Sequence, residues 1–165
     1  MSRPRYRVVA WTGHRPDLFR DPAAAQLAVE AAGRELVKAG ATRFLVGGQR
    51  GVDTWAAYAA KAMAVPFTLV LPLPVDEFAR DWSEIDRSVL LHAVASAADV
   101  RIAGTYAARN QILAREADLL VAVWTCTLGG GTAETLEYAR QFGTPIRELR
   151  LEPSATAESA TGRGI

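Results

Sequence analysis

The sequence predicts an α/β fold in which helices cover both faces of a parallel sheet. Short apolar runs rich in β-branched and aromatic residues recur along the 165-residue chain, and alanine-rich stretches with helical spacing separate them. Hydrophobic residues make up 50% of the composition, so a chain of this length buries a sizeable core. Strands that alternate with helices of this length form right-handed β-α-β units, which place their strands parallel in one sheet.

Six apolar runs are expected to form the strands. In chain order they are YRVVAW, RFLVGG, FTLVLP, DVRIAG, DLLVAVW and PIREL. The first helix is expected in AAAQLAVEAAGRELVKAG, where Leu27, Ala31 and Leu36 are predicted to share the buried face. Gly40 and Gly143 follow the first and last expected helices, at positions where glycine commonly ends a helix.

The chain is expected to form a single domain over residues 1–151. From residue 152 onward the sequence EPSATAESATGRGI is small, polar and aperiodic, so residues 152–165 are predicted to be a disordered tail. The start lacks the apolar core of a signal peptide, and the longest apolar run is too short to span a bilayer. A single cysteine, Cys126, excludes an intramolecular disulfide and fits a reducing compartment. We therefore expect a cytoplasmic protein.

The charge balance argues against a general attraction to polyanions. Nineteen Lys and Arg residues against 18 Asp and Glu residues give a net charge of +1. Such a chain has no overall field that draws in DNA, RNA or an acidic membrane. Nucleic-acid binding would need a local basic patch, and no membrane partner is expected.

Four loops of unusual composition fall at the carboxyl ends of expected strands, where ligands bind in open parallel sheets. They are TGHRP, GGQRGVD, GTYAARN and TCTLGGGTAE. In the last loop, Gly129, Gly130 and Gly131 allow backbone N–H groups to approach an anion, and Thr132 can cap the next helix and donate a hydroxyl. The alternative is a glycine-rich turn with Glu134 in a first turn favoured by the helix dipole.

The second loop repeats this pattern on another strand. Gly47 and Gly48 precede Arg50, and an arginine held among glycines suits bidentate contact with phosphate or carboxylate. Asp53 stands where it can cap or begin a helix. The alternative is an Arg50–Asp53 pair that stabilises the loop.

The other two loops supply further polar candidates. His14 and Arg15 follow the first strand, and His14 either binds a ligand or hydrogen-bonds a neighbouring loop. Arg109 and Asn110 stand near the start of a helix, where the dipole disfavours an arginine, so a bound anion would explain Arg109. The alternative is an ordinary surface arginine. No residue pattern indicates a metal site, a separate cofactor or a Ser-His-Asp triad.

The tryptophans have two interpretations. Trp11 and Trp124 each end a strand beside a glycine loop, where one of them could stack on a base, but the core is the more common place for tryptophan in a small α/β domain. Trp82 and Asp86 lie in DWSEIDRS, which is expected to begin a helix and to form a lip over the pocket.

Together these motifs resemble the SLOG superfamily, a Rossmann-like group that includes the Lonely Guy phosphoribohydrolases and DprA, and they are most similar to its YpsA-like members. The likeness covers residues 6–148 through TGHRP, GGQRGVDTWAA, DWSEIDR, RNQIL and LLVAVW followed by GGGTAETLEYA. The resemblance implies a three-layer sandwich with a mostly parallel sheet and a cleft for a nucleotide or an ADP-ribose-like ligand. Ligand contacts are expected from Thr12, Gly13, His14, Arg15, Gly47, Gly48, Arg50, Asn110, Gly129, Gly130, Gly131 and Thr132.

The resemblance leaves two functions open. One is a binding domain that reports on its ligand. The other is an enzyme that cleaves an N-glycosidic bond of a nucleoside monophosphate, with Arg109 and Glu134 as the catalytic pair. The Lonely Guy loop reads Pro-Gly-Gly-x-Gly-Thr-x-x-Glu, whereas here Thr135 occupies the final position and Glu134 lies one residue early. A DprA-like nucleic-acid function is a weaker third interpretation. A homo-oligomer, most simply a dimer, is expected through alanine-rich helix faces.

Overall fold

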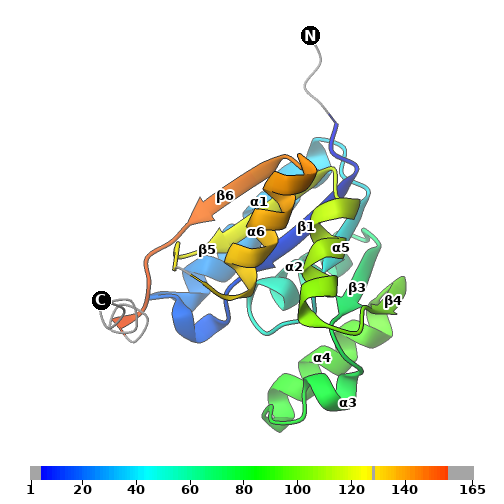
Figure 1. Cartoon of the computed structure of the whole chain (residues 1–165), viewed down its shortest axis with the longest axis vertical. Helices are drawn as coiled ribbons and strands as arrows, with labels where there is room; N and C mark the ends of the chain where they lie inside the picture. Colours follow the sequence, from blue (N-terminus) through cyan, green and yellow to red (C-terminus); the bar gives the residue numbers. More distant parts are fainter. Residues whose placement is uncertain (1–4, 128, 156–165) are drawn as a thin grey trace.

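The chain folds around a six-stranded, all-parallel sheet with helices on both faces (Figure 1). The computed structural model describes residues 5–127 and 129–155. The order of the strands is β4-β3-β2-β1-β5-β6. The predicted α/β sandwich is therefore confirmed. Of the predicted tail, residues 156–165 lie outside the described part of the chain.

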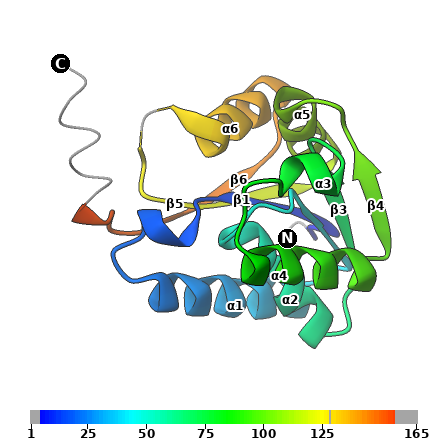
Figure 2. The same cartoon turned by 90° about the horizontal axis from the view of Figure 1, so that it is seen from below.

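Each of the six apolar runs contains all or most of one strand. The strands are β1 (Val8–Gly13), β2 (Arg43–Val46), β3 (Phe67–Leu71), β4 (Asp99–Ile102), β5 (Leu119–Trp124) and β6 (Ile146–Arg150). The helices are α1 (Pro22–Lys38), α2 (Val52–Ala62), α3 (Val75–Phe78), α4 (Glu84–Ser96), α5 (Tyr106–Glu116) and α6 (Gly130–Phe142), with a 3-10 turn at Pro16–Leu18. Figure 2 shows α1, α2 and α4 on one face of the sheet and α5 and α6 on the other.

The buried face of α1 differs from the predicted one. Leu36 is buried, but Leu27 is 64% exposed and Ala31 is exposed as well. Leu27 and Leu36 are nine residues apart, and at about 100° per residue this separation places them on opposite sides of the helix. The face that packs on the core has the spacing of a helical stripe and consists of Ala25, Val29, Ala32, Gly33 and Leu36.

The central strands are buried on both faces. Trp11 on β1 is fully buried and lies against Phe44 with ring centroids 5.3 Å apart, so its role is in the core. Trp124 at the end of β5 is partly buried, and its indole N–H donates to Glu148 on β6. No helix in the described ranges is long and apolar enough to cross a membrane.

The strand order fixes the place where a ligand would bind. From β1 the chain builds the sheet outward through β2, β3 and β4, and it then returns to add β5 on the other side of β1. The register aligns Thr12 with Ala122 and Gly13 with Val123. At such a switch point the loops that follow two neighbouring strands diverge to opposite faces and leave a crevice. The loops after β1 and β5 therefore flank the candidate site.

Candidate functional site

A cavity of about 440 Å³ lies at the carboxyl ends of the strands, beside the switch point. It is built by the end of β1, the loops after β1, β2 and β5, the first turns of α2 and α6, and the first two turns of α5. Its lining residues are Thr12, Gly13, His14, Arg15, Leu18, Gln49, Asp53, Tyr106, Arg109, Asn110, Leu113, Thr127, Gly129, Gly130, Gly131 and Thr132.

Most of the residues expected at the ligand line this one cavity. Those residues are Thr12, Gly13, His14, Arg15, Arg109, Asn110, Gly129, Gly130, Gly131 and Thr132. Four other expected residues, Gly47, Gly48, Arg50 and Glu134, do not line it. The loops therefore meet at one cavity, but only some of their residues line it.

The first turn of α6 presents backbone N–H groups at the cavity. Gly129 precedes the helix with φ 79° and makes no side-chain cap, and Gly130 follows with φ 86°. Thr132, predicted as a possible cap, instead lies within the first turn and is buried. The first N–H groups of a helix have no partner within it, and the positive end of the helix dipole favours an anion there.

Arg109 is a buried cation in the wall of the cavity. It is 7% exposed, its Nε donates to Asn110 Oδ1 at 2.7 Å, and its Nη1 donates to the Gly47 carbonyl at 2.6 Å. Its guanidinium carbon lies 5.7 Å from the centre of the Tyr106 ring. These partners hold the guanidinium in one orientation, with further N–H groups available to an anion.

Gly47 and Gly48 make room for packing rather than for a ligand. A Cβ atom on Gly47 would overlap the Arg109 guanidinium and would lie 2.9 Å from Asp53 Oδ2. Gly48 adopts φ 82°, and a Cβ there would overlap the side chain of Leu71. Both glycines are therefore required for the close approach of α5 and β3 to this loop.

Asp53 is the buried carboxylate of the site. It lies in the first turn of α2, is 5% exposed, and accepts a hydrogen bond from the Gln49 N–H at 3.1 Å. Its Oδ1 has no hydrogen-bond partner among the described residues. Burial raises the pKa of Asp53 to about 6, although the charge of Arg109 and the Gln49 hydrogen bond lower it. Burial lowers the pKa of Arg109, and the charge of Asp53 opposes that effect.

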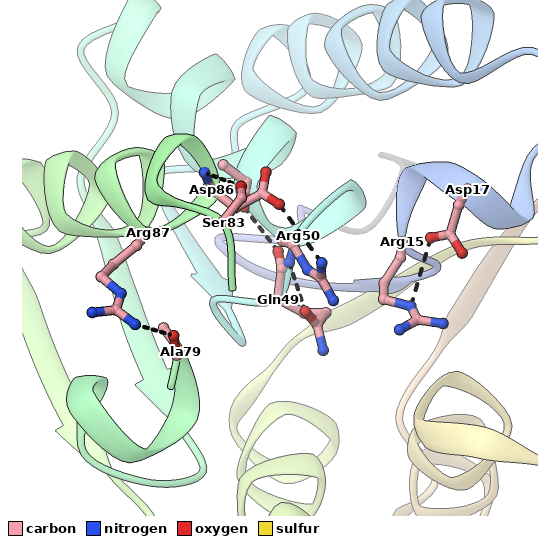
Figure 3. A network of polar contacts seen from close by, with 9 residues as sticks. Arg15, Asp17, Gln49, Arg50, Ala79, Ser83, Asp86 and Arg87 are labelled. Atoms are coloured by element: carbon pink, nitrogen blue, oxygen red, sulfur yellow. Dashed lines mark hydrogen bonds and ion pairs between the residues drawn. The ribbon is translucent and has the colours of Figure 1, made fainter. Parts of the chain in front are cut away.

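Arg50 pairs with a different carboxylate from the one considered in the sequence. Its Nη1 lies 3.6 Å from Asp86 Oδ2, and its guanidinium carbon lies 5.0 Å from the centre of the Trp82 ring. Figure 3 shows Arg50 directed toward Asp86 at the start of α4, where Ser83 caps the helix. Arg50 therefore connects the loop after β2 to α4 instead of lining the cavity.

His14 and Arg15 differ in their exposure. His14 is buried, lies 6.2 Å from Trp124 between ring centroids, and has an Nε2 atom without a hydrogen-bond partner among the described residues. Burial, and to a lesser extent the charge of Arg15, lowers the pKa of His14. Arg15 is exposed at the rim, with its Nε 3.7 Å from Asp17 Oδ1 (Figure 3).

Glu134 lies on an exposed side of α6 and outside the lining of the cavity. Its charge nevertheless contributes to raising the pKa of Arg109, so the two side chains are within electrostatic reach. The carboxylate that does line the cavity is Asp53.

Six lining residues were absent from the predicted set. They are Leu18, Gln49, Asp53, Tyr106, Leu113 and Thr127. Asp53 could have been predicted from the sequence. It lies in the first helical turn after a glycine loop, and such a residue lies at the same edge of the sheet as the loop itself. Leu18 and Leu113 could not have been predicted in this way, because a leucine in a turn or a helix is expected in the core rather than at a ligand.

The chain matches no family model and no curated protein, but its fold recurs in solved structures. The DNA processing protein A (DprA) of Helicobacter pylori, whose structure concerns single-stranded DNA binding, matches with a TM-score of 0.63 at 21% identity, over 95% of this chain and 72% of that one. Streptococcus pneumoniae DprA matches with a TM-score of 0.66 at 16% identity over 96% of this chain, which spans 60% of that protein's length. The Moco carrier protein of Chlamydomonas reinhardtii matches with a TM-score of 0.60 at 25% identity, over 93% and 81% of the two chains.

These likenesses show that the α/β fold of this chain recurs in the DprA proteins. One of these proteins binds single-stranded DNA, and another carries the molybdenum cofactor (Moco). Function must therefore be argued from the site.

The packing at Gly47 leads to a prediction about stability. Gly47→Ala is expected to lower the free energy of unfolding by about 1–3 kcal/mol, because the added methyl group displaces the Arg109 guanidinium. Gly33→Ala in α1 is the matched control. Its Cβ would meet neighbours at 3.5 Å or more, so it is expected to stabilise by about 0.5–1 kcal/mol. Urea unfolding of the three proteins measures both effects, and equal unfolding free energies for Gly47→Ala and wild type would contradict this account.

The pKa of Asp53 leads to a prediction about pH. Below about pH 6 the Asp53 carboxyl is neutral, so the cavity is more positive by one charge than at pH 7.5. Sulfate, whose charge is constant in this range, is expected to bind roughly tenfold more tightly at pH 5 than at pH 7.5. Protonation of His14 acts in the same direction, but at lower pH because its pKa is depressed.

Two variants separate these groups in a sulfate titration followed by NMR. Asp53→Asn is expected to remove most of the gain in affinity between pH 7.5 and pH 5, whereas His14→Asn is expected to keep it. The assignment to Asp53 fails if the Asp53→Asn protein retains the full pH dependence.

Proposed function

We propose that this chain binds a nucleotide or a nucleotide-derived, ADP-ribose-like phosphate in the cavity and acts as a sensor, as a YpsA-like member of the SLOG superfamily. The observation that carries the proposal is the convergence of the α6 N-terminus and the Arg109 guanidinium on one cavity. Oriented N–H groups and a fixed guanidinium are two complementary ways to hold a phosphate.

The unpartnered polar atoms favour a phosphate that carries a sugar. Asp53 Oδ1 and His14 Nε2 are buried acceptors or donors without protein partners in the described chain. Buried polar groups are ordinarily satisfied, so a hydroxyl of a bound ribose is a suitable partner for Asp53. Tyr106, which lines the cavity and is 48% exposed, offers a ring face for the base.

Hydrolysis of an N-glycosidic bond is the second candidate function. In that reaction water adds to C1′ of the ribose, the bond from C1′ to the base breaks, and the base leaves with a proton. A carboxylate beside the ribose stabilises the positive charge of the transition state. Asp53, which lines the cavity and has a pKa of about 6, is placed to accept the proton of the water, whereas Glu134 lies outside the lining.

Calorimetric titration tests the binding function. ADP-ribose and AMP are expected to bind, and Arg109→Ala is expected to weaken both by roughly thirtyfold or more because a charge-assisted contact is lost. Arg115→Ala, on the same helix and stacked over Phe142, is the matched control and is expected to bind normally. A 2′,3′-dideoxy analogue of AMP is expected to bind roughly tenfold more weakly, because it leaves Asp53 Oδ1 unpaired.

A steric variant tests whether the first turn of α6 binds the phosphate. Gly131 has an ordinary φ, and only Asn110 Nδ2 would lie within 4 Å of an added Cβ, at 3.9 Å. Gly131→Val is therefore expected to keep the fold and to lose nucleotide binding, while Gln141→Val near the other end of α6 keeps both. Unchanged nucleotide affinity in Gly131→Val would contradict phosphate binding at the first turn of α6.

A DNA-binding assay tests the DprA-like function. Retention of single-stranded DNA that weakens steeply with salt would favour that function over nucleotide binding.

Product analysis separates the sensor from the hydrolase. Chromatography of AMP incubated with the protein would show free adenine and ribose 5-phosphate if hydrolysis occurs. We expect nucleotide binding without base release. If base appears, loss of turnover in Asp53→Asn with retention in Glu134→Gln would assign the proton acceptor to Asp53, and the opposite pattern would assign it to Glu134.

A further inference from the structure

The strand β4 forms an edge of the sheet and carries exposed apolar side chains. Val100 is 37% exposed and Ile102 is 55% exposed, although helices ordinarily cover both faces of a parallel sheet. Within the described residues β4 pairs with β3 only, in a register that aligns Leu69 with Val100 and Leu71 with Ile102. Figure 1 shows β4 at the margin of the sheet, remote from β6. An edge of this kind presents unpaired backbone N–H and C=O groups to a further strand.

The opposite edge is better protected. On β6, Ile146 and Leu149 are only partly exposed, and each of them packs against buried core residues on its own face of the sheet. Glu148 accepts the indole N–H of Trp124, and Arg150 pairs with Glu148 at 3.1 Å. The exposed large apolar side chains of the sheet are therefore confined, among the described residues, to β4.

The charges of β4 alternate with its apolar residues. The strand reads Asp99, Val100, Arg101, Ile102, so the two charged side chains point to one face and the two apolar side chains to the other. Arg101 Nη1 lies 2.8 Å from Glu116 Oε1 at the end of α5, which places the charged side chains on the α5 face. In an antiparallel pair of identical strands, residues whose numbers have a constant sum lie opposite each other.

We propose that β4 pairs antiparallel with β4 of a second copy of this chain, about a two-fold axis that passes through the Val100 pair. In this register Asp99 of each copy lies opposite Arg101 of the other, and the apolar side chains meet on the other face. An isologous interface requires such self-complementarity, and opposite charges across neighbouring strands attract. An axis through Arg101 would instead place two arginines opposite each other, which is unfavourable.

This surface differs from the alanine-rich helix face that the sequence suggested for a dimer. On α1 the exposed large apolar side chain is Leu27, whereas β4 carries two such side chains that alternate with two opposite charges. The β4 edge also lies outside the cavity lining, so the inference is independent of the proposed function.

Sedimentation velocity of the full chain across the micromolar range tests the pairing. Wild type is expected to be a dimer. Asp99→Arg and Arg101→Asp each turn two attractive pairs into two repulsive ones and are expected to raise the dissociation constant roughly tenfold or more. An equimolar mixture of the two variants restores both opposite-charge pairs and is expected to form a heterodimer. Arg147→Asp on β6 is the control and should leave the dimer intact.

A double variant keeps the test decisive if a single variant fails to fold by circular dichroism. Asp99→Arg combined with Arg101→Asp exchanges the charges within each copy, so it should form a dimer like the wild type. A monomeric wild type overturns the inference, as does a dimer that persists in both folded single variants. Loss of the dimer in Leu27→Lys with retention in Asp99→Arg would assign the interface to α1 and would also overturn it.

Discussion

The buried Arg109 guanidinium is the constraint on which the site depends. A cation that is 7% exposed requires hydrogen-bond partners and a counter-charge, because desolvation disfavours an isolated buried charge. Here the Gly47 carbonyl, the Asn110 amide and the Asp53 carboxylate supply them. These groups belong to the loop after β2, to α5 and to the first turn of α2. The solvation of one side chain therefore ties together three segments that are distant in the sequence.

This arrangement also sets the electrostatic character of the cavity. The α6 N-terminus and Arg109 favour an anion, while Asp53 opposes it in its charged form and not in its neutral form. Because burial moves the pKa of Asp53 to about 6, the balance changes within a mildly acidic range rather than far below it. A fixed cation beside a titratable carboxyl is a common feature of functional sites, and it gives the cavity a pH-dependent affinity without any movement of the chain.

The sequence was sufficient to predict the sheet and the edge of the sheet at which the cavity lies. Buried parallel strands require apolar runs, and the glycine loops mark the ends of those runs, so both features are local. Contacts made across the fold were not predictable in this way. Arg50 has a carboxylate three residues away at Asp53, yet it pairs with Asp86, because the choice depends on how α4 packs.

The direction in which a residue points from its helix explains two other differences between the predicted and the observed positions. Leucine is a residue type that suits the buried face of α1, but Leu27 lies on the side of the helix that faces solvent. A stripe of mostly smaller residues packs against the sheet instead. Glu134 follows the glycine-threonine loop closely in sequence, but α6 already begins at Gly130, which leaves Glu134 on an exposed side. In both cases the residue type was suitable and the start of the helix decided its direction.

Helix α5 connects the two surfaces for which a function is argued. Arg109 stands in its first half at the cavity wall, and Glu116 at its end holds Arg101 of the β4 edge. The Arg101–Glu116 pair is partly exposed, so it contributes little to stability alone. Its position matters more, because a partner's Asp99 opposite Arg101 would compete with Glu116 for the same guanidinium. An interface at β4 would therefore contact α5 at its C-terminal end, through the exchangeable Arg101–Glu116 pair, while the first half of the same helix lines the cavity.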